Sequence, residues 1–269
     1  MPTVPAAEAP PGTQSLTRSI RLLRVVATRG EIGWRLSDLA AACELDKGTA
    51  HRMLASLVKE RLVQQRPGDR RYLAGPLLYE LGLSLPGHHD FQRSAETQLR
   101  ALSRRMNATA LLLLRSGSEY VCSVCIGPSR LPGLMVDQGT RRPLFTSVGG
   151  VAILQTLADA EVKAVLAKNV AHELSTRGNT RLQALKTMRD RSRRYGFGVN
   201  LGDVVAGLHA FAVPLHAPDG KAFAALCLMG MAERFPETRL AEVRTELDQL
   251  AGVLEAEAAK TVYRTQGVE

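Results

Sequence analysis

Residues 15–75 follow an order of segments that few folds accommodate: a helix, a short helix, a tight turn and a third helix. Apolar side chains recur at steps of three and four over 15–28, which predicts an amphipathic helix with its arginines on the opposite face. A short helix is predicted over 37–43. Three residues, Glu44-Leu45-Asp46, separate it from a third helix that begins at Lys47, with the aspartate as N-cap.

Two short extended segments follow the third helix. They cover 62–65 and 71–74 and are separated by Arg66-Pro67-Gly68-Asp69, where Pro followed by Gly favours a type II turn. The pair predicts a small two-stranded ribbon. Three helices followed by a ribbon are the order of a winged helix-turn-helix, whose second motif helix enters the major groove of DNA.

The third helix has two different faces. Ala50, Leu54 and Leu57 form its apolar stripe, and the opposite face, centred on Gly48 and Arg52, carries no acidic residue. An arginine here can read guanine in the major groove, whereas ribbon arginines position the protein on phosphates. The candidate DNA contacts are Lys47, Gly48, Thr49, His51, Arg52 and Ser56 in the helix, and Arg66, Arg70 and Arg71 in the ribbon.

The positive charge is concentrated in the same third of the chain. Twelve Lys and Arg against six Asp and Glu lie between Ser15 and Gly75, which gives this segment +6 of the formal charge of +9. Clustered positive charge supports phosphate binding through counterion release. On charge alone, a solvated basic surface is an equal alternative.

The pattern changes after residue 89. Helices are predicted over 90–106, 150–157, 159–167, 181–195 and 238–262, and strands over 108–115, 120–126, 133–138, 197–201, 208–216 and 222–229. Strands mixed with helices without regular alternation indicate an α+β domain. The predicted organisation is a flexible tail at 1–14, a winged helix-turn-helix at 15–75, a linker helix at 76–89 and an α+β domain at 90–269.

Composition excludes several other classes. The 269 residues are 45% hydrophobic and 23% charged, which is typical of globular domains. No apolar run reaches the roughly 18 residues that cross a bilayer, and the proline-rich N-terminus is unlike a secretory signal. Four cysteines make no disulfide framework, so we expect a cytoplasmic protein with reduced thiols. Aromatic residues, at 4%, are too few for a base-stacking single-strand binder.

Two possible metal or redox motifs are weak. Cys122 and Cys125 form a C-x-x-C inside a predicted strand, where a spacing of three places the sulfurs on opposite faces. Packing within the strand is the favoured interpretation, with metal or redox chemistry as the alternative. His88-His89 has no companion ligands, and no phosphate-binding loop or nucleophile elbow is present. We therefore expect no metal site, cofactor or catalytic residue.

Several segments, taken in order, resemble the IclR family of bacterial transcriptional regulators. The resemblance covers nearly the whole chain from Ser15 onward. It is carried by 15–23, 36–40 and 46–57 in the helix-turn-helix, and by Arg142-Pro143-Leu144-Phe145-Thr146-Ser147-Val148-Gly149-Gly150-Val151-Ala152, Tyr195-Gly196-Phe197-Gly198 and 207–215 beyond it.

This resemblance implies that the α+β domain is GAF-like and binds a small organic effector, and that the protein forms dimers or tetramers. The residues at matching positions, which the resemblance implies line the effector pocket, are Leu144, Val148, Gly149, Asn200, Leu208, Ala210, Cys227 and Met229. Gly149 and Gly150 precede an apolar segment, so their free N–H groups are expected to receive a carboxylate. Val151 and the Cys227–Met229 strand depart from the family's more polar pattern, which favours an aromatic effector over a small keto acid.

The leading interpretation is therefore a ligand-responsive, sequence-specific regulator that controls a metabolic operon and acts as a symmetric oligomer on operator DNA. One alternative is an enzyme on a GAF-like scaffold with an accessory basic domain, which is disfavoured because no nucleophile and base can be paired. Another alternative is a nonspecific architectural DNA binder, which would show no preference for one site.

Overall fold

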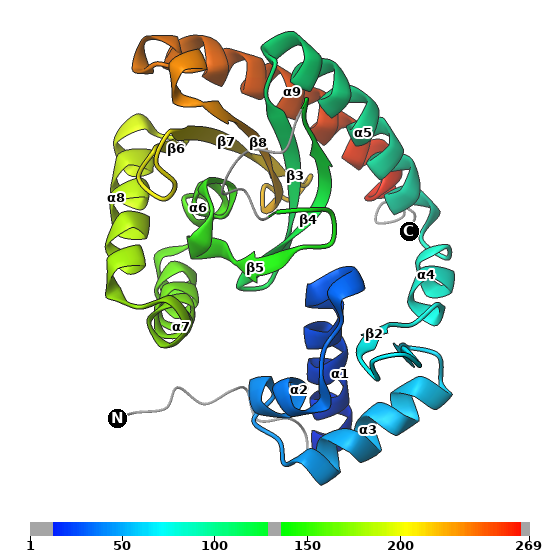
Figure 1. The fold of residues 1–269 in the computed structure, drawn as a ribbon. Coiled ribbons are helices and arrows are strands. Elements are labelled where there is room, and N and C mark those ends of the chain that lie inside the picture. Colours follow the sequence, from blue (N-terminus) through cyan, green and yellow to red (C-terminus); the bar gives the residue numbers. More distant parts are fainter. Residues whose placement is uncertain (1–12, 129–135, 265–269) are drawn as a thin grey trace. The chain divides into compact units, whose positions relative to one another are not determined.

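The computed structural model describes residues 13–128 and 136–264, and its chain divides into two compact units, Met1–Leu85 and Pro86–Glu269 (Figure 1). The first twelve residues of the expected tail lie outside the described residues. None of the described helices is long and apolar enough to cross a membrane.

The first unit has the expected order of a winged helix-turn-helix. Its elements are α1 Gln14–Val26, the 3-10 segment η1 Ala27–Ile32, α2 Leu36–Ala42, α3 Lys47–Lys59, β1 Val63–Gln65, β2 Tyr72–Ala74 and α4 Leu77–Gly82. The strands β1 and β2 pair antiparallel, and Trp34 adds an isolated bridge to Tyr72. The expected linker helix over 76–89 is therefore divided, because α4 ends at Gly82 and the next helix already begins at Pro86.

One small core holds the three helices of this unit together. Leu22 of α1, Leu39 of α2 and Leu54 of α3 are completely buried in it. Asp46 caps α3 as expected, since its Oδ1 accepts a hydrogen bond of 2.8 Å from the N–H of Thr49. The core leaves the first two turns of α1 uncovered, and Leu16, expected in the buried stripe, is 62% exposed.

The wing hairpin differs from the expected type II turn. The positive φ lies at Arg70, at +55°, rather than at Gly68. The N–H of Arg70 donates to the carbonyl of Arg66 at 2.9 Å, and the N–H of Arg66 donates to the carbonyl of Arg71 at 2.8 Å. The connection is thus a longer loop closed by an i to i+4 hydrogen bond, because Arg70 and Arg71 belong to the loop as well.

The second unit is built on a six-stranded antiparallel sheet of order β5-β4-β3-β8-β7-β6. Its strands are β3 Thr109–Ser116, β4 Glu119–Ile126, β5 Arg141–Pro143, β6 Gly198–Leu201, β7 Leu208–His216 and β8 Ala222–Met231. Its helices are α5 Pro86–Met106, α6 Val148–Leu154, α7 Asp159–Arg177, α8 Asn179–Tyr195 and α9 Leu240–Thr261, with short 3-10 segments η2 Leu144–Thr146, η3 Ala232–Arg234 and η4 Glu237–Arg239.

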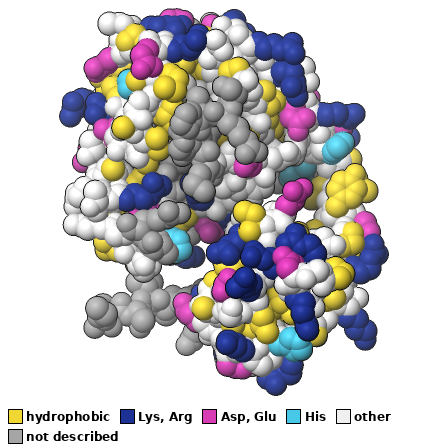
Figure 2. Space-filling model, in the orientation of Figure 1, with side chains coloured by type: hydrophobic (Ala, Val, Ile, Leu, Met, Phe, Trp, Pro, Cys, Tyr) yellow, Lys and Arg dark blue, Asp and Glu magenta, His cyan; other side chains and the backbone are white. Residues whose placement is uncertain are grey.

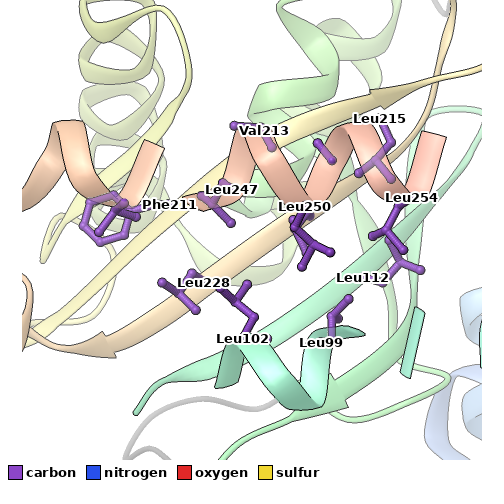
Figure 3. Close-up of a cluster of buried hydrophobic side chains, with 14 of the residues drawn as sticks. Leu99, Leu102, Leu112, Phe211, Val213, Leu215, Leu228, Leu247, Leu250 and Leu254 are labelled. Carbon is purple, nitrogen blue, oxygen red and sulfur yellow. The ribbon is translucent and has the colours of Figure 1, made fainter. Parts of the chain in front are cut away.

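Helices α5 and α9 cover one face of this sheet. Figure 3 shows Leu99 of α5 and Leu250 of α9 converging on side chains of the sheet, among them Leu112 of β3 and Leu228 of β8. Because side chains alternate along a strand, the residues between them point to the other face. The α+β architecture expected from the sequence is confirmed.

Helices α6, α7 and α8 lie on the opposite face (Figure 1). The buried side chains there include Leu111, Leu113, Ala212 and Cys227 from the sheet and Leu185 from α8. This face is lined by smaller side chains than the first one, so α6 can approach the strands closely.

The strand predicted over 133–138 is not found in the part of this segment that the structure describes. Residues 133–135 lie outside the described residues, and 136–138 form no strand. The chain instead turns beside β4, where the N–H of Cys122 donates to Thr140 and the N–H of Gly139 donates to Cys122, both at 2.8 Å. The unexpected strand β5 then pairs with the start of β4.

Ser192 joins α8 to β6, the strand that carries Asn200. Its hydroxyl is completely buried, donates to the carbonyl of Met188 at 2.8 Å and accepts from the N–H of Val199 at 2.9 Å. Removing a hydroxyl with two such bonds leaves a buried N–H unpaired.

We predict that Ser192→Ala lowers the free energy of unfolding by about 1–3 kcal/mol, because the N–H of Val199 loses its partner. The matched control is Thr187→Ala, since the exposed Thr187 hydroxyl bonds only its own helix. That change should stay within about 0.5 kcal/mol. Urea denaturation monitored by circular dichroism measures both, and equal effects would contradict the role given to Ser192.

Candidate functional site

Helix α3 presents a polar, positively charged face opposite its buried stripe. Ala50, Leu54 and Leu57 are buried, as predicted. Among the predicted DNA-contacting residues of α3, Lys47, Gly48, His51, Arg52 and Ser56 are exposed and Thr49 is half-buried. The face therefore presents hydrogen-bond donors on a rigid scaffold.

A local network orders the start of this face. Arg52 Nη2 donates to Thr49 Oγ1 at 3.1 Å, while the N–H of Thr49 is held by Asp46. The hydrogen bond from the Thr49 side chain is the largest cause that lowers the pKa of Asp46. The guanidinium thus lies along the helix, and its remaining N–H groups are available for other partners.

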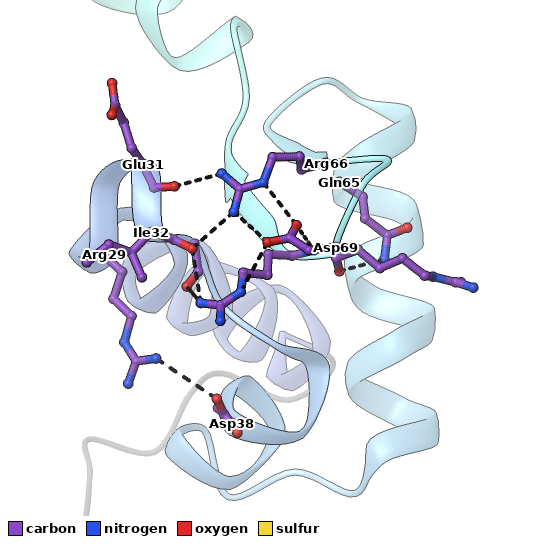
Figure 4. A network of polar contacts seen from close by, with 10 residues as sticks. Arg29, Glu31, Ile32, Asp38, Gln65, Arg66 and Asp69 are labelled. Carbon is purple, nitrogen blue, oxygen red and sulfur yellow. Dashed lines mark hydrogen bonds and ion pairs between the residues drawn. The ribbon is translucent and has the colours of Figure 1, made fainter.

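Two of the three wing arginines are tied to the protein itself, as Figure 4 shows for Arg66 and Asp69. Arg66 makes a two-point ion pair with Asp69, with contacts of 2.9 and 2.6 Å, and donates to the carbonyl of Glu31 at 2.9 Å. Arg71 Nε also lies 3.2 Å from Asp69, and its Nη1 donates to Ile32. We call these contacts of Arg66 and Arg71 with Asp69, Glu31 and Ile32 the wing latch. They fix the β1–β2 hairpin to the end of η1.

Arg70 is outside that latch. It is exposed, and its guanidinium makes no ion pair or hydrogen bond among the described residues, although its carbonyl accepts a hydrogen bond of 3.0 Å from Gln65 Nε2. Over the visible surface of this unit, Lys and Arg side chains are numerous, with carboxylates between them (Figure 2). The sequence did not distinguish the free wing arginine from the two that hold the hairpin.

The second unit contains a cavity of about 150 Å³ between the sheet and helices α6 and α8. Strands β3, β4, β7 and β8 supply its floor. The lining residues are Leu111, Leu113, Tyr120, Val136, Arg142, Thr146, Ser147, Val148, Arg181, Met188, Asn200, Val204, Val205, Leu208, Ala210, Cys227 and Met229.

Six of the eight predicted pocket residues line this cavity: Val148, Asn200, Leu208, Ala210, Cys227 and Met229. Leu144 and Gly149 do not. Leu144 is completely buried in the apolar core beside the cavity. Gly149 faces the sheet, where an added Cβ would lie 2.5 Å from Cys227 Sγ, so this glycine permits close packing of α6.

The expectation of free N–H groups at Gly149 and Gly150 is wrong for Gly150. Both glycines lie inside α6, and Ser147 caps the helix by accepting a 3.0 Å hydrogen bond from the N–H of Gly150. The signal for this cap is present in the sequence, because serine three residues before the capped N–H is a common N-cap arrangement.

The sequence interpretation missed most of the polar groups of the cavity. Tyr120 is buried and hydrogen-bonded to the side chain of Ser147, and burial raises the pKa of its hydroxyl. Arg142 and Arg181 also line the cavity, and Arg181 Nε lies 2.6 Å from the buried Glu173. No described lining residue is acidic. Arg181 lies on a strongly basic helix and carried no signal that would separate it from surface arginines.

The two cysteines of the C-x-x-C motif share a face of the sheet, contrary to expectation. The register of β4 against β3 shifts at Ser123, so that Cys122 lies opposite Leu113 and Cys125 opposite Leu111. A β-bulge adds one residue to the strand and thereby restores the same face after three residues. The described residues contain no cluster of three or more His, Cys, Asp or Glu that could hold a metal ion.

A helix-turn-helix unit with a polar, basic α3 and a second unit with a cavity lined by apolar and polar side chains together define a ligand-binding DNA-binding regulator. Residues 15–67 match the family model of the IclR helix-turn-helix domain, and residues 85–255 match that of the C-terminal domain of bacterial IclR transcriptional regulators. The chain therefore belongs to the IclR family. It is a DNA-binding transcriptional regulator rather than an enzyme, as predicted.

Relatives of known role agree with this assignment. The chain is 28% identical to the HTH-type transcriptional regulator KdgR of Escherichia coli, over 92% of this chain and 94% of KdgR. It is 29% identical to the glycerol operon regulatory protein of Streptomyces griseus, over 82% and 86% of the two chains. The fold is similar to that of an IclR homologue from Microbacterium hydrocarbonoxydans crystallised with 4-hydroxybenzoate, with a TM-score of 0.66, 19% identity and coverage of 90% and 98%.

We predict that Arg66→Ala raises the pKa of Asp69 from about 2 toward its ordinary value of 3.8, because the side-chain hydrogen bond from Arg66 is the largest cause of the low value. A carboxyl whose pKa is lower in the folded state stabilises the fold above its ordinary pKa, and this contribution is lost as the pH falls from about 4 to 2. Carboxyl carbon NMR titration measures the change.

Arg70→Ala is the control for this prediction. It removes a neighbouring positive charge that makes no contact with Asp69, so the low pKa of Asp69 should persist. An unchanged pKa of Asp69 in Arg66→Ala would show that the wing latch is not formed in solution.

Proposed function

We propose that the protein reads an operator through the exposed face of α3, with Lys47, Gly48, Thr49, His51, Arg52 and Ser56 as its DNA contacts. The observation that carries this proposal is the polarity of α3: its apolar stripe is completely engaged in the core, while its opposite face is basic and free of carboxylates. Gly48 allows the backbone to approach the duplex closely, and Arg52 retains N–H groups for a guanine edge.

The wing arginines have two tasks in this proposal. Arg70 is positioned to contact a phosphate directly, because it is exposed and outside the wing latch. Arg66 and Arg71 hold the hairpin in place through Asp69 and contact phosphates only with the N–H groups that the latch leaves over. These contacts orient the protein on the duplex and add little sequence preference.

We further propose that the protein acts as a homodimer or a homotetramer in the cytoplasm. The region around α4 is strongly apolar on its surface: Tyr79 is 72% exposed, Leu81 54% and Leu83 56%. An exposed cluster of large apolar side chains is typical of a protein interface. A two-fold pairing through it would place two copies of α3 on the half-sites of a pseudo-palindromic operator.

The effector that fits the cavity is an aromatic carboxylate. A cavity of about 150 Å³ holds one benzene ring in a protein core. Leu208, Ala210 and Met229 offer the ring an apolar surface, while Arg142 and Arg181, the latter paired with Glu173, bring guanidinium groups to the wall of the cavity. The 4-hydroxybenzoate in the Microbacterium homologue supports this class of ligand. Asn200 and Tyr120 would then bond its polar groups.

The effector would act by shifting an equilibrium between two arrangements of paired winged helices. It shifts that equilibrium only by its difference in affinity for the two arrangements, which is typically worth about 1–3 kcal/mol. The regulated genes would be those of a metabolic operon that consumes the effector, in line with the operon named for the Streptomyces relative.

We predict that Arg52→Ala abolishes the preference for the operator over random DNA, because a direct base contact is lost. The operator is obtained by selecting genomic fragments with the purified protein. Arg70→Ala is the matched control, and it should weaken binding to both DNAs equally and reduce the dependence on salt. Uniform weakening by Arg52→Ala would instead favour a nonspecific architectural binder.

We predict that Ala210→Leu blocks the cavity and abolishes binding of 4-hydroxybenzoate, measured by calorimetry, while operator binding persists. Ala210 is buried on the cavity floor, so the larger side chain occupies the space of the ring. Met229→Leu conserves volume and should keep the binding. Tighter binding of a two- or three-carbon acid than of aromatic acids would contradict the proposed ligand class.

A further inference from the structure

The β-bulge at Ser123 brings two thiols together on the cavity side of the sheet. Tyr120 and Cys122 belong to the core on that side, Val124 faces the α5–α9 side, and Cys125 returns to the cavity side. Without the bulge, Cys122 and Cys125 would point to opposite faces. The two side chains are close enough to shift one another's pKa, while each thiol donates to a backbone carbonyl, Cys122 to Val124 at 3.3 Å and Cys125 to Val136 at 3.4 Å.

The two thiols have different surroundings. Cys122 is completely buried, and the neighbouring Cys125 side chain and burial both raise its pKa. Cys125 is partly exposed, and the neighbouring Cys122 side chain lowers its pKa, although burial and Asp137 act in the opposite direction. Cys125 is therefore the thiol that a reagent from solution meets first and the one more easily ionised.

Cys125 is also hydrogen-bonded to a residue that lines the cavity. Its Sγ donates to the carbonyl of Val136 at 3.4 Å, and Val136 lines the cavity. The two hydrogen bonds between the backbone of Cys122 and residues 139 and 140 fix the same segment to β4. The cysteine pair therefore lies at the point where residues 136–140 are attached to β4.

We propose that Cys122 and Cys125 form a reversible oxidation site, which a peroxide converts to an intramolecular disulfide and thereby releases Val136 at the edge of the cavity. The register positions of the two cysteines are two residues apart along β3, so their Cα atoms are about 6–7 Å apart. Disulfides usually span roughly 4.4–6.8 Å, so this bond forms at the upper limit and is readily reduced.

The chemistry needs one peroxide and no other reagent. The Cys125 thiol first releases its proton, the thiolate attacks one oxygen of hydrogen peroxide, the O–O bond breaks, and the departing hydroxide takes up the released proton and becomes water. The Cys122 sulfur then attacks the sulfenic acid, the S–S bond forms, and the S–O bond breaks. A second water leaves with the proton of Cys122. The two thiols lose two electrons in total, and the peroxide gains them.

The expected effect on the cavity rests on the proposed function of that cavity, whereas the oxidation itself does not. In the disulfide, the sulfur of Cys125 no longer carries a proton, so the hydrogen bond to Val136 is lost. Drawing the sulfurs together also pulls on the backbone of Cys122, whose hydrogen bonds hold Gly139 and Thr140.

Tryptic peptide mapping of the unmodified protein tests the oxidation site. Trypsin cuts after Arg115 and Arg130, so the 116–130 peptide contains both cysteines, while Cys43 and Cys227 fall in the separate 36–47 and 222–234 peptides. After peroxide treatment and iodoacetamide, we expect the 116–130 peptide to lose two hydrogens and escape alkylation, and dithiothreitol to reverse both changes. An unchanged peptide, or a cross-link from it to the Cys227 peptide, overturns the proposal.

Variants assign the two positions. Cys125→Ser and Cys122→Ala should each abolish the disulfide, whereas Cys43→Ser and Cys227→Ala should keep it. If buried Cys122 tolerates no change, peptide mapping of the unmodified chain still decides the question. Persistence of the disulfide in folded Cys125→Ser would refute the assignment.

Amide hydrogen exchange tests the link to the cavity without any effector. In protein shown by mass to hold the disulfide, we expect faster exchange at residues 136–140 than in the reduced protein, and unchanged exchange in α9. Equal exchange at 136–140 would overturn the link. Failure of 4-hydroxybenzoate to bind would count against the proposed effector class and leave both results intact.

Discussion

The second unit depends on burial of both faces of one antiparallel sheet. Leucine and phenylalanine on one face fill the space beneath α5 and α9, while alanine and cysteine on the other face admit α6 at close range. The two faces are chemically different because side chains alternate along each strand. Gly149 completes the arrangement, since any side chain there would collide with Cys227 and Leu113. A cavity remains between the sheet and helices α6 and α8.

In the first unit, two aspartates organise positive charge. Asp46 caps α3 and holds Thr49, which in turn receives Arg52. Asp69 gathers Arg66 and Arg71 and leaves Arg70 exposed. A basic surface therefore becomes an ordered one, because each carboxylate fixes the direction of the guanidinium groups around it.

Prediction from the sequence succeeded where a pattern is local and periodic. The stripe of Ala50, Leu54 and Leu57, the cap at Asp46 and strands β7 and β8 all follow from spacing along a single element. Prediction failed where the structure of one element depends on its contacts with another. Leu16 belongs to a periodic stripe but extends past the core, and the type II turn gave way to a longer loop that lets Asp69 reach both arginines.

The residues that line the candidate cavity likewise divide into those that the sequence predicted and those that it missed. Asn200, Ala210 and Met229, which the resemblance to the family predicts for the pocket, line this cavity, yet Tyr120, Arg142 and Arg181 come from segments with no distinguishing pattern. The sequence by itself determined the class of protein, the order of the elements of the helix-turn-helix and the positive charge of α3, because these depend on neighbours within a few residues. Only the tertiary structure decided which arginines are free, which side of the sheet the cysteines face and which side chains enclose the cavity. Those outcomes depend on strand register, on one bulged residue and on contacts between segments far apart in the chain.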